Sequence, residues 1–146
     1  MKKRQAGPAG SWPPDEAWTL PEAVDLGTGR TRVHLQPVAQ GRDFLVLITG
    51  GQAHVGAVAA CNGRGSRDHV RSQPGTIQLT GHREGPLAAE AAEILALASG
   101  RTCAAAVGIH QDQATPEEIH EIVAHVREGL DQMAAVFRAG GIHDTD

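Results

Sequence analysis

The sequence predicts an α+β fold in two layers, in which two helices pack on one mixed β-sheet. Residues 31–61 form apolar or alternating runs separated by short turns, a pattern typical of strands. Residues 85–100 and 115–141 instead repeat apolar residues every three or four positions, as amphipathic helices do. A further apolar run, 101–109, lies between the two helices. The predicted order is an N-terminal antiparallel meander followed by strand, helix, strand and helix.

The strands follow one another closely in the first half of the chain. Residues 31–40 alternate apolar and polar side chains, and residues 43–50 form a continuous apolar run that indicates a central, buried strand. A third run covers residues 53–61, and residues 76–81 form a fourth strand after a loop rich in Gly and Arg at 62–68. Because the first connections are too short for parallel crossovers, we expect the first three strands to be antiparallel neighbours.

The two helices carry clear start and stop signals. Pro86 suits the first turn of the first helix, and Gly100 suits its end. Thr115 and Glu118 form a capping box at the start of the second helix, with Pro116 at its first position. The predicted apolar stripe of this helix consists of Ile119, Ile122, Val123, Val126, Leu130, Met133 and Phe137. His120 and His125 are expected to lie in solvent on its polar face.

The domain organisation follows from the composition along the chain. Residues 1–29 are rich in Gly, Pro and polar residues and are predicted to form a flexible arm, which could pin a tryptophan onto the domain. Residues 30–140 form a single α/β domain, and residues 141–146 form a short tail. A length of 146 residues suits one domain with a modest core.

Composition excludes several classes of function. Only 3 % of the residues are aromatic, with no Tyr, and the net charge is −4, which argues against nucleic-acid binding by base stacking or by a basic surface. No run approaches the ~18 apolar residues of a membrane span, and the basic start lacks a following apolar segment, so a cytoplasmic protein is predicted. Cys61 and Cys103 lie within apolar runs and are interpreted as structural thiols.

Chemistry-bearing residues gather where strands end. The strand–helix–strand unit from 76–81 to 101–109 makes its two strands parallel, so both carboxyl ends lie at one edge of the sheet, where ligands bind in open α/β sheets. The segments "GHREG" (81–85) and "GIHQD" (108–112) stand at these ends, each before a helix N-terminus. A third turn, "GGQAH" (50–54), joins them if its strand ends at the same edge.

The candidate binding residues at this edge are Gly50, Gly51, His54, His82, Arg83, Glu84, His110 and Asp112. Glycines allow close approach of a ligand, and helix N-termini with Arg83 attract an anion such as phosphate. A metal ion held by His54, His82, Glu84 and His110 is the alternative, and such an ion would itself bridge to phosphate oxygens. The same residues also fit a plainer interpretation as helix-entry turns, with Glu84 facing the helix dipole.

Three motifs in this order carry a family resemblance: "ITGGQAHVGAV" (48–58), "GHREGPLAAEAA" (81–92) and "AVGIHQDQATPEEIHEIV" (106–123). Together they resemble the LpdD-like prenylated-flavin chaperones, the small accessory proteins of hydroxyarylic-acid (gallate and vanillate) decarboxylases, over residues 33–137. The resemblance implies a homodimeric α/β protein that is not an enzyme or only a weak one. It implies binding of prenylated FMN, or FMN, and a role as chaperone or maturation factor for a UbiD-type decarboxylase, with the flavin prenyltransferase as a further partner.

Two other functions stay open on the residues alone. A small metal-dependent enzyme could use His54, His82 and His110 around a metal-activated water. An interaction or scaffold protein could use the long last helix as its contact surface. The scarcity of aromatic residues requires aliphatic walls, or a dimer partner, around a bound flavin ring.

Overall fold

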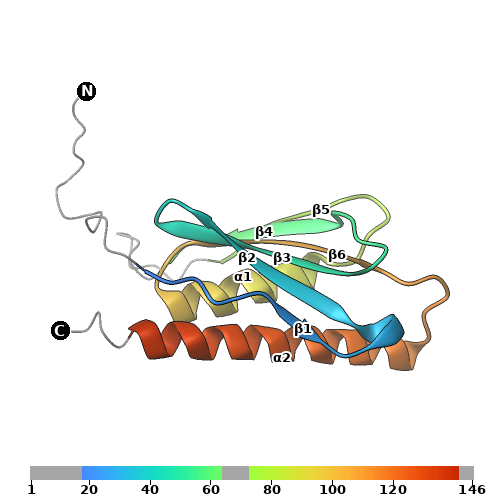
Figure 1. Ribbon diagram of the computed structural model, residues 1–146. Coiled ribbons are helices and arrows are strands. Elements are labelled where there is room, and N and C mark those ends of the chain that lie inside the picture. Colours follow the sequence, from blue (N-terminus) through green and yellow to red (C-terminus); the bar gives the residue numbers. More distant parts are fainter. Residues whose placement is uncertain (1–17, 64–72, 142–146) are drawn as a thin grey trace.

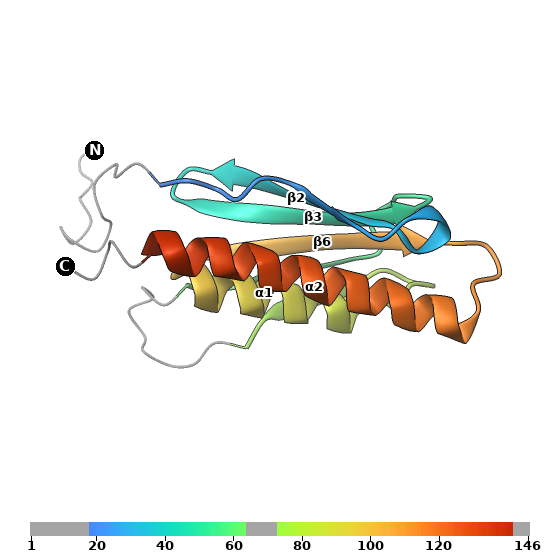
Figure 2. The same ribbon diagram turned by 60° about the horizontal axis from the view of Figure 1, so that its bottom comes forward.

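The architecture, from a computed structural model, is one six-stranded sheet with two helices on a single face (Figure 1). The structure describes residues 18–63 and 73–141. The elements in chain order are β1 (Val24–Leu26), the 3-10 helix η1 (Gly29–Thr31), β2 (Val33–Gln40), β3 (Asp43–Gly51), β4 (Ala57–Cys61), β5 (Gly75–Gln78), α1 (Gly85–Ser99), β6 (Cys103–His110) and α2 (Pro116–Gly141). The predicted α+β class is confirmed. In the described residues no helix covers the opposite face of the sheet (Figure 2).

The sheet has the order β1-β2-β3-β6-β4-β5. An N-terminal antiparallel meander is present and consists of β1, β2 and β3. The prediction that the strands at 43–50 and 53–61 are neighbours is wrong, because β6 lies between β3 and β4. β6 pairs parallel with β3 and antiparallel with β4. Since β5 is antiparallel to β4, β5 and β6 run in the same direction, as predicted.

The core lies between the sheet and the helices. Alternation along the strands puts one set of side chains in this layer, for example Phe44, Val46 and Ile48 on β3, which are at most 1 % exposed. α1 presents mainly alanines and Leu95 to the sheet, so it can approach closely. α2 contributes Val126, Leu130 and other members of its predicted stripe. The scarcity of aromatic residues is therefore met by small and aliphatic side chains.

The start of α2 matches its sequence signals, and two details differ. Thr115 accepts a hydrogen bond from the Glu118 N–H at 3.1 Å, and Glu118 accepts one from the Thr115 N–H at 3.0 Å, which confirms the capping box. Ile119, predicted as a core residue, is 50 % exposed. The prediction that His125 is solvated is wrong: its Nδ1 lies 2.8 Å from the carbonyl oxygen of Thr31, and the ring packs where a Cβ on Gly27 would stand.

The described part of the predicted arm packs on the domain. β1, which lies within the predicted arm of residues 1–29, pairs with β2 of the domain, and Trp18 lies against the core. Residues 1–17 of the arm, residues 64–68 of the predicted Gly- and Arg-rich loop and residues 142–146 of the tail lie outside the described residues. Among the helices of the described residues, none has the length and apolar character that crossing a membrane requires.

Candidate functional site

The connection from β3 to β4 crosses the carboxyl end of β6, and this crossing places His54. The Gln52 N–H donates to the His110 carbonyl at 2.8 Å, and the Gly56 N–H donates to the Val107 carbonyl at 2.9 Å. Between these two anchors the chain passes so close to Gly108 that a Cβ there would overlap the His54 carbonyl. Glycine at position 108 is thus a condition for bringing His54 to the end of the parallel β3–β6 pair.

Glu84 is the second fixed member of the site. It stands at the N-cap of α1, and its side chain makes no hydrogen bond that caps the helix. Its Oε2 instead accepts from the Ile109 N–H, and its Oε1 accepts from the Arg83 N–H, both at 3.2 Å. A Cβ on Gly56 would overlap this carboxylate. The side chain is 14 % exposed, so a negative charge on this carboxylate would need a positive partner beside it.

His54 presents a free nitrogen to that carboxylate. Its Nδ1 lies 3.0 Å from the Gln52 carbonyl oxygen, which can only accept, so Nδ1 carries the hydrogen. In the neutral ring, Nε2 therefore offers a lone pair. This Nε2 lies 3.1 Å from Glu84 Oε2, yet it is buried and not aligned in a hydrogen bond. A nitrogen lone pair and a carboxylate oxygen this close repel each other unless a proton or a cation lies between or beside them.

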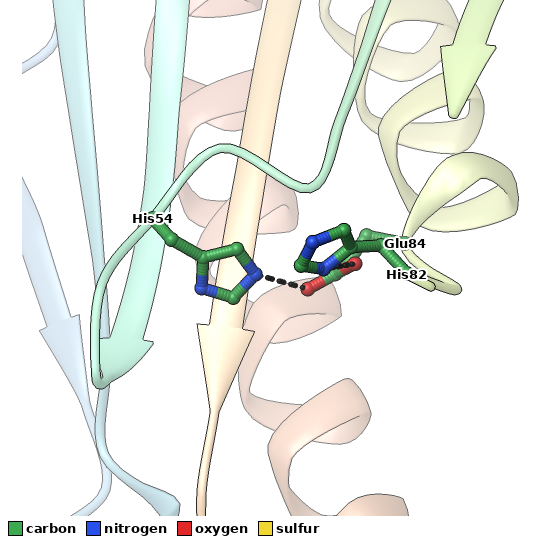
Figure 3. A group of neighbouring side chains, drawn as sticks. All are labelled: His54, His82 and Glu84. Atoms are coloured by element: carbon green, nitrogen blue, oxygen red, sulfur yellow. Dashed lines mark ion pairs between the residues drawn. The ribbon is translucent and has the colours of Figure 1, made fainter. Parts of the chain in front are cut away.

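His82 completes a three-residue cluster (Figure 3). Its ring centroid lies 4.8 Å from that of His54, and its Nδ1 is 3.8 Å from Glu84 Oε1. Each of His54, His82 and Glu84 offers one ligand atom, and these atoms all lie within 4.8 Å of one another. Two imidazoles and a carboxylate are the donor set that suits Zn²⁺, Mn²⁺ or Fe²⁺, and three protein ligands leave positions open for a bound group.

The remaining predicted site residues occupy nearby but different positions. His110 lies at the end of β6 with its Nε2 2.9 Å from Asp112 Oδ1, and its ligand atoms are not part of the three-residue cluster. Gly50 pairs with Ile109 and Gly51 with His110 in the parallel ladder. A Cβ on Gly51 would overlap the His110 carbonyl, so this glycine permits the strand pairing. The structure thus brings His54, His82, Glu84 and His110 to one edge, with the first three in direct proximity.

A cleft of about 550 Å³ extends from this cluster between the two helices. His54, His82, Arg83, Glu84 and His110 line one end of it. Its walls are mainly aliphatic and include Pro86, Leu87, Ile109, Ala114, Ile119, Ile122 and Val123. The volume is within the range of small-molecule sites, about 300–1,000 Å³. A polar end with apolar walls suits an amphiphilic ligand that carries a charged group.

Sequence reasoning missed the walls of this cleft and its second polar feature. Ile119, Ile122 and Val123 follow the core periodicity of α2, and periodicity alone does not separate a wall from a core. Arg127 on α2 pairs with Glu90 on α1 through bonds of 2.8 and 3.1 Å, and both residues line the cleft. The hydrogen bond and charge of Glu90 raise the pKa of Arg127.

The two helix N-termini are less available to an anion than their sequence positions suggested. At α2 the capping box uses the Glu118 N–H, and the Glu118 carboxylate itself faces the positive end of the helix. At α1 the Gly85 N–H donates to Gln78 Oε1 at 2.8 Å. An anion at this edge would therefore depend on the exposed Arg83 and on a cation in the cluster.

The side chain of Arg30, in η1, holds the turn between β6 and α2 through hydrogen bonds. Arg30 donates to Glu118 Oε2 at 2.8 Å and to the Asp112 carbonyl at 2.7 Å. The hydrogen bond from Arg30, together with the one from the Thr115 N–H, lowers the pKa of Glu118. These contacts fix the segment that carries His110 and Asp112 relative to the rest of the sheet.

One of three comparisons with known proteins identifies a family. Residues 27–138 match the family model described as the prenylated flavin chaperone LpdD-like domain. No curated protein is significantly similar in sequence. Among solved structures, the chain is similar to a protein in the crystal structure of a novel chaperone complex for yeast 20S proteasome assembly, at 9 % sequence identity and a TM-score of 0.46. That match covers 80 % of this chain and 97 % of the other.

Proposed function

The chain belongs to the prenylated flavin chaperone LpdD-like family, and from this premise we propose that it holds prenylated FMN in the cleft and delivers it to a UbiD-type aromatic acid decarboxylase. One observation carries the proposal for the site: a metal-capable cluster stands at one end of an aliphatic cleft of about 550 Å³. Prenylated FMN has matching parts, a phosphate dianion at one end and a largely apolar ring system with a prenyl-derived addition at the other.

The phosphate end is assigned to the cluster. His54 Nε2, His82 and Glu84 would hold a divalent cation, and the buried Nε2 without a hydrogen-bond partner is the strongest support for this role. The cation and Arg83 would supply the positive charge for phosphate oxygens, a role for which metal ions are well suited. Glu84, fixed by the N–H groups of Arg83 and Ile109, would orient the cation. His110 with Asp112, and the backbone at Gly50 and Gly51, would border this end.

The ring end is assigned to the aliphatic walls. Leu87 on α1 and Ile119, Ile122 and Val123 on α2 offer apolar surface on both sides of the cleft. Ile119 is 50 % exposed, and covering such a side chain with a ligand contributes about 25 cal/mol per Å² of apolar area buried. Aliphatic contact without aromatic stacking favours moderate affinity, which suits a protein that must release its ligand to an enzyme.

The wider assignment follows from the same role. We propose that the protein is a homodimer and not itself an enzyme, and that the flavin prenyltransferase is the source of its ligand. Cys61 and Cys103 are paired residues on the adjacent strands β4 and β6 and form no disulfide bond with each other. Adjacent unoxidised thiols suit a reducing compartment, so we place the protein in the cytoplasm.

The test is co-expression with a flavin prenyltransferase, followed by native mass spectrometry and absorbance spectroscopy of the purified protein. We expect a bound, phosphate-bearing flavin together with a metal ion. His54→Ala should remove both, whereas His120→Ala, an exposed histidine on α2, should leave both in place. A colourless wild-type protein without flavin affinity at micromolar concentration would overturn the proposal. A tightly bound metal without any flavin would instead favour a metal-dependent enzyme.

A further inference from the structure

The face of the sheet opposite the helices is apolar at its centre. The alternation that buries Phe44, Val46 and Ile48 turns the intervening side chains of β3 to this side. We define the open-face patch as Val38, Leu45, Leu47, Val58, Ile77 and Ala106. The register aligns Leu47 with Ala106, Ala106 with Val58, and Val58 with Ile77 across four adjacent strands. Val38 is 39 %, Leu47 38 % and Ile77 63 % exposed.

The patch also lacks charge. None of its six members, and none of the residues that continue its two rows across the strands (Gln36, Ala60, Gly75 and Ala104), carries a charge. Charged side chains occur at the border instead: Asp25 on β1 is bonded to His34 and Arg32, each at 2.9 Å. An apolar centre with a polar border is the arrangement of protein interfaces, whose cores are depleted in charged residues.

We propose that the open-face patch is the interface between two copies of this chain, packed sheet against sheet about a twofold axis. In such an interface the same surface faces itself, so any charge at its centre would meet its own like charge. A patch without charge meets this condition. A partner of different sequence would not require it. The inference goes beyond flavin binding and gives the proposed homodimer its contact surface.

The size of the patch suits a weak dimer. Five strands about 4.8 Å apart and two rows of side chains about 6.6 Å apart give a flat area of roughly 24 by 13 Å, or on the order of 300 Å² per copy. Two copies would bury on the order of 600 Å² through the patch itself, so the polar border must contribute as well for the interface to reach the lower limit of about 1,000 Å². We therefore expect a dimer that dissociates in the micromolar range. The clefts, on the helix side of the sheet, would face away from the interface.

Sedimentation velocity of the full chain at about 1 to 200 µM tests the proposal. The wild-type protein should approach twice its monomer mass of 15.3 kDa. Leu47→Glu and Ile77→Glu should each raise the dimer dissociation constant at least about 100-fold, because each places charges within an apolar interface. Leu97→Glu on α1 and Val136→Glu on α2, where the wild-type residues are 54 % and 49 % exposed, are matched controls and should change it less than threefold.

Three results would overturn the interface: a monomeric wild-type protein at about 200 µM, a dimer insensitive to Leu47→Glu, or a dimer broken by either control. Circular dichroism and thermal unfolding of each variant separate lost association from lost folding. FMN titration of the Leu47→Glu monomer distinguishes this proposal from the function of the cleft. Dissociation with retained flavin binding supports the interface alone, whereas absence of flavin binding in all forms counts only against the proposed function.

Discussion

The two ends of the parallel β3–β6 pair carry different side chains. At the start of these strands, Trp18, Phe44 and Phe137 form a cluster with ring centroids 4.9 to 6.4 Å apart, and Arg101 lies over the Trp18 ring at 4.1 Å. At the other end stand His54, His82 and Glu84 at the mouth of an aliphatic cleft. The first end, called the aromatic end below, holds aromatic rings in the core. The second, called the ligand end after its proposed role, holds polar atoms that could act as metal ligands.

This difference explains how a chain with two Trp and two Phe can build a core and still leave an aliphatic cleft. Three of these residues meet at the aromatic end, where their large apolar area stabilises the junction of sheet, α2 and the N-terminal segment. Among the described residues, the lining of the ligand end therefore includes no Trp or Phe and relies on Leu, Ile and Val. Stability and ligand binding should accordingly respond to substitutions at opposite ends of the same strands.

The largest expected effect is the low reactivity of the thiol of Cys103, the first residue of β6, at the aromatic end. Burial, with Cys61 beside it, raises the pKa of its thiol from 9.0 to about 12. At pH 8 iodoacetamide should therefore modify native Cys103 at least about 1,000-fold more slowly than free cysteine, because the thiolate is the reactive form. The neutral thiol favours the folded state, so this contribution to stability is present below pH 9 and is lost as the pH rises toward 12.

Peptide mapping after timed alkylation, with and without urea, measures the reaction of Cys103. Rapid labelling is expected only in urea. If native Cys103 reacted at the rate of a free thiol, the aromatic end would be open to water and the contrast between the two ends would fail.

Next in size is the loss of stability on Phe44→Ala. Phe44 is 1 % exposed and contacts both Trp18 and Phe137, so truncation should lower the free energy of unfolding by about 3–5 kcal/mol in urea titration. Phe44→Leu is the milder control and should cost under about 1.5 kcal/mol. FMN affinity, measured at low temperature where the variant is folded, should change less than threefold. A parallel loss of affinity would mean that the two ends are coupled.

The smallest effect on folding, with a clear effect on binding, is expected at the ligand end. His82→Ala should weaken binding of Zn²⁺ or Mn²⁺ in calorimetry by about 10- to 100-fold, whereas His110→Ala, whose imidazole pairs with Asp112, should change it less than threefold. The His82→Ala/His110→Ala double variant should bind no flavin and unfold within about 0.5 kcal/mol of the wild type, because His82 is only partly buried and His110 is exposed. A large loss of stability would instead assign these histidines to the fold.

The sequence predicted where the helices and strands lie along the chain better than it predicted which strands are adjacent in the sheet. Periodicity and capping residues located both helices, and the capping box at Thr115 and Glu118 is confirmed. Strand order failed at one place, because β6 enters the sheet between β3 and β4 from more than forty residues away. Adjacency of this kind depends on long-range packing, and local sequence patterns do not contain it.

The same insertion decides which site residues meet. Because the segment from Gln52 to Gly56 must pass over the end of β6, His54 reaches Glu84, a contact that the expected meander did not require. The turns at 81–85 and 108–112 lie at one edge of the sheet, as predicted, and the turn at 50–54, whose position depended on the strand order, joins them there. The walls of the cleft were not predicted, since Ile119 has the same helical spacing as the buried residues of α2 and differs only in what the sheet covers.

Gly56 and Gly108 lie under the two groups that define the site, the Glu84 carboxylate and the His54 backbone. Any side chain at either position begins with a Cβ atom, and this atom would push the neighbouring group away. The distance between the His54 imidazole and the Glu84 carboxylate therefore depends on glycine at both positions. For protein engineering, this means that the donor set cannot be transplanted as three residues alone: a receiving scaffold must also provide two gaps in its backbone packing, one beneath each donor.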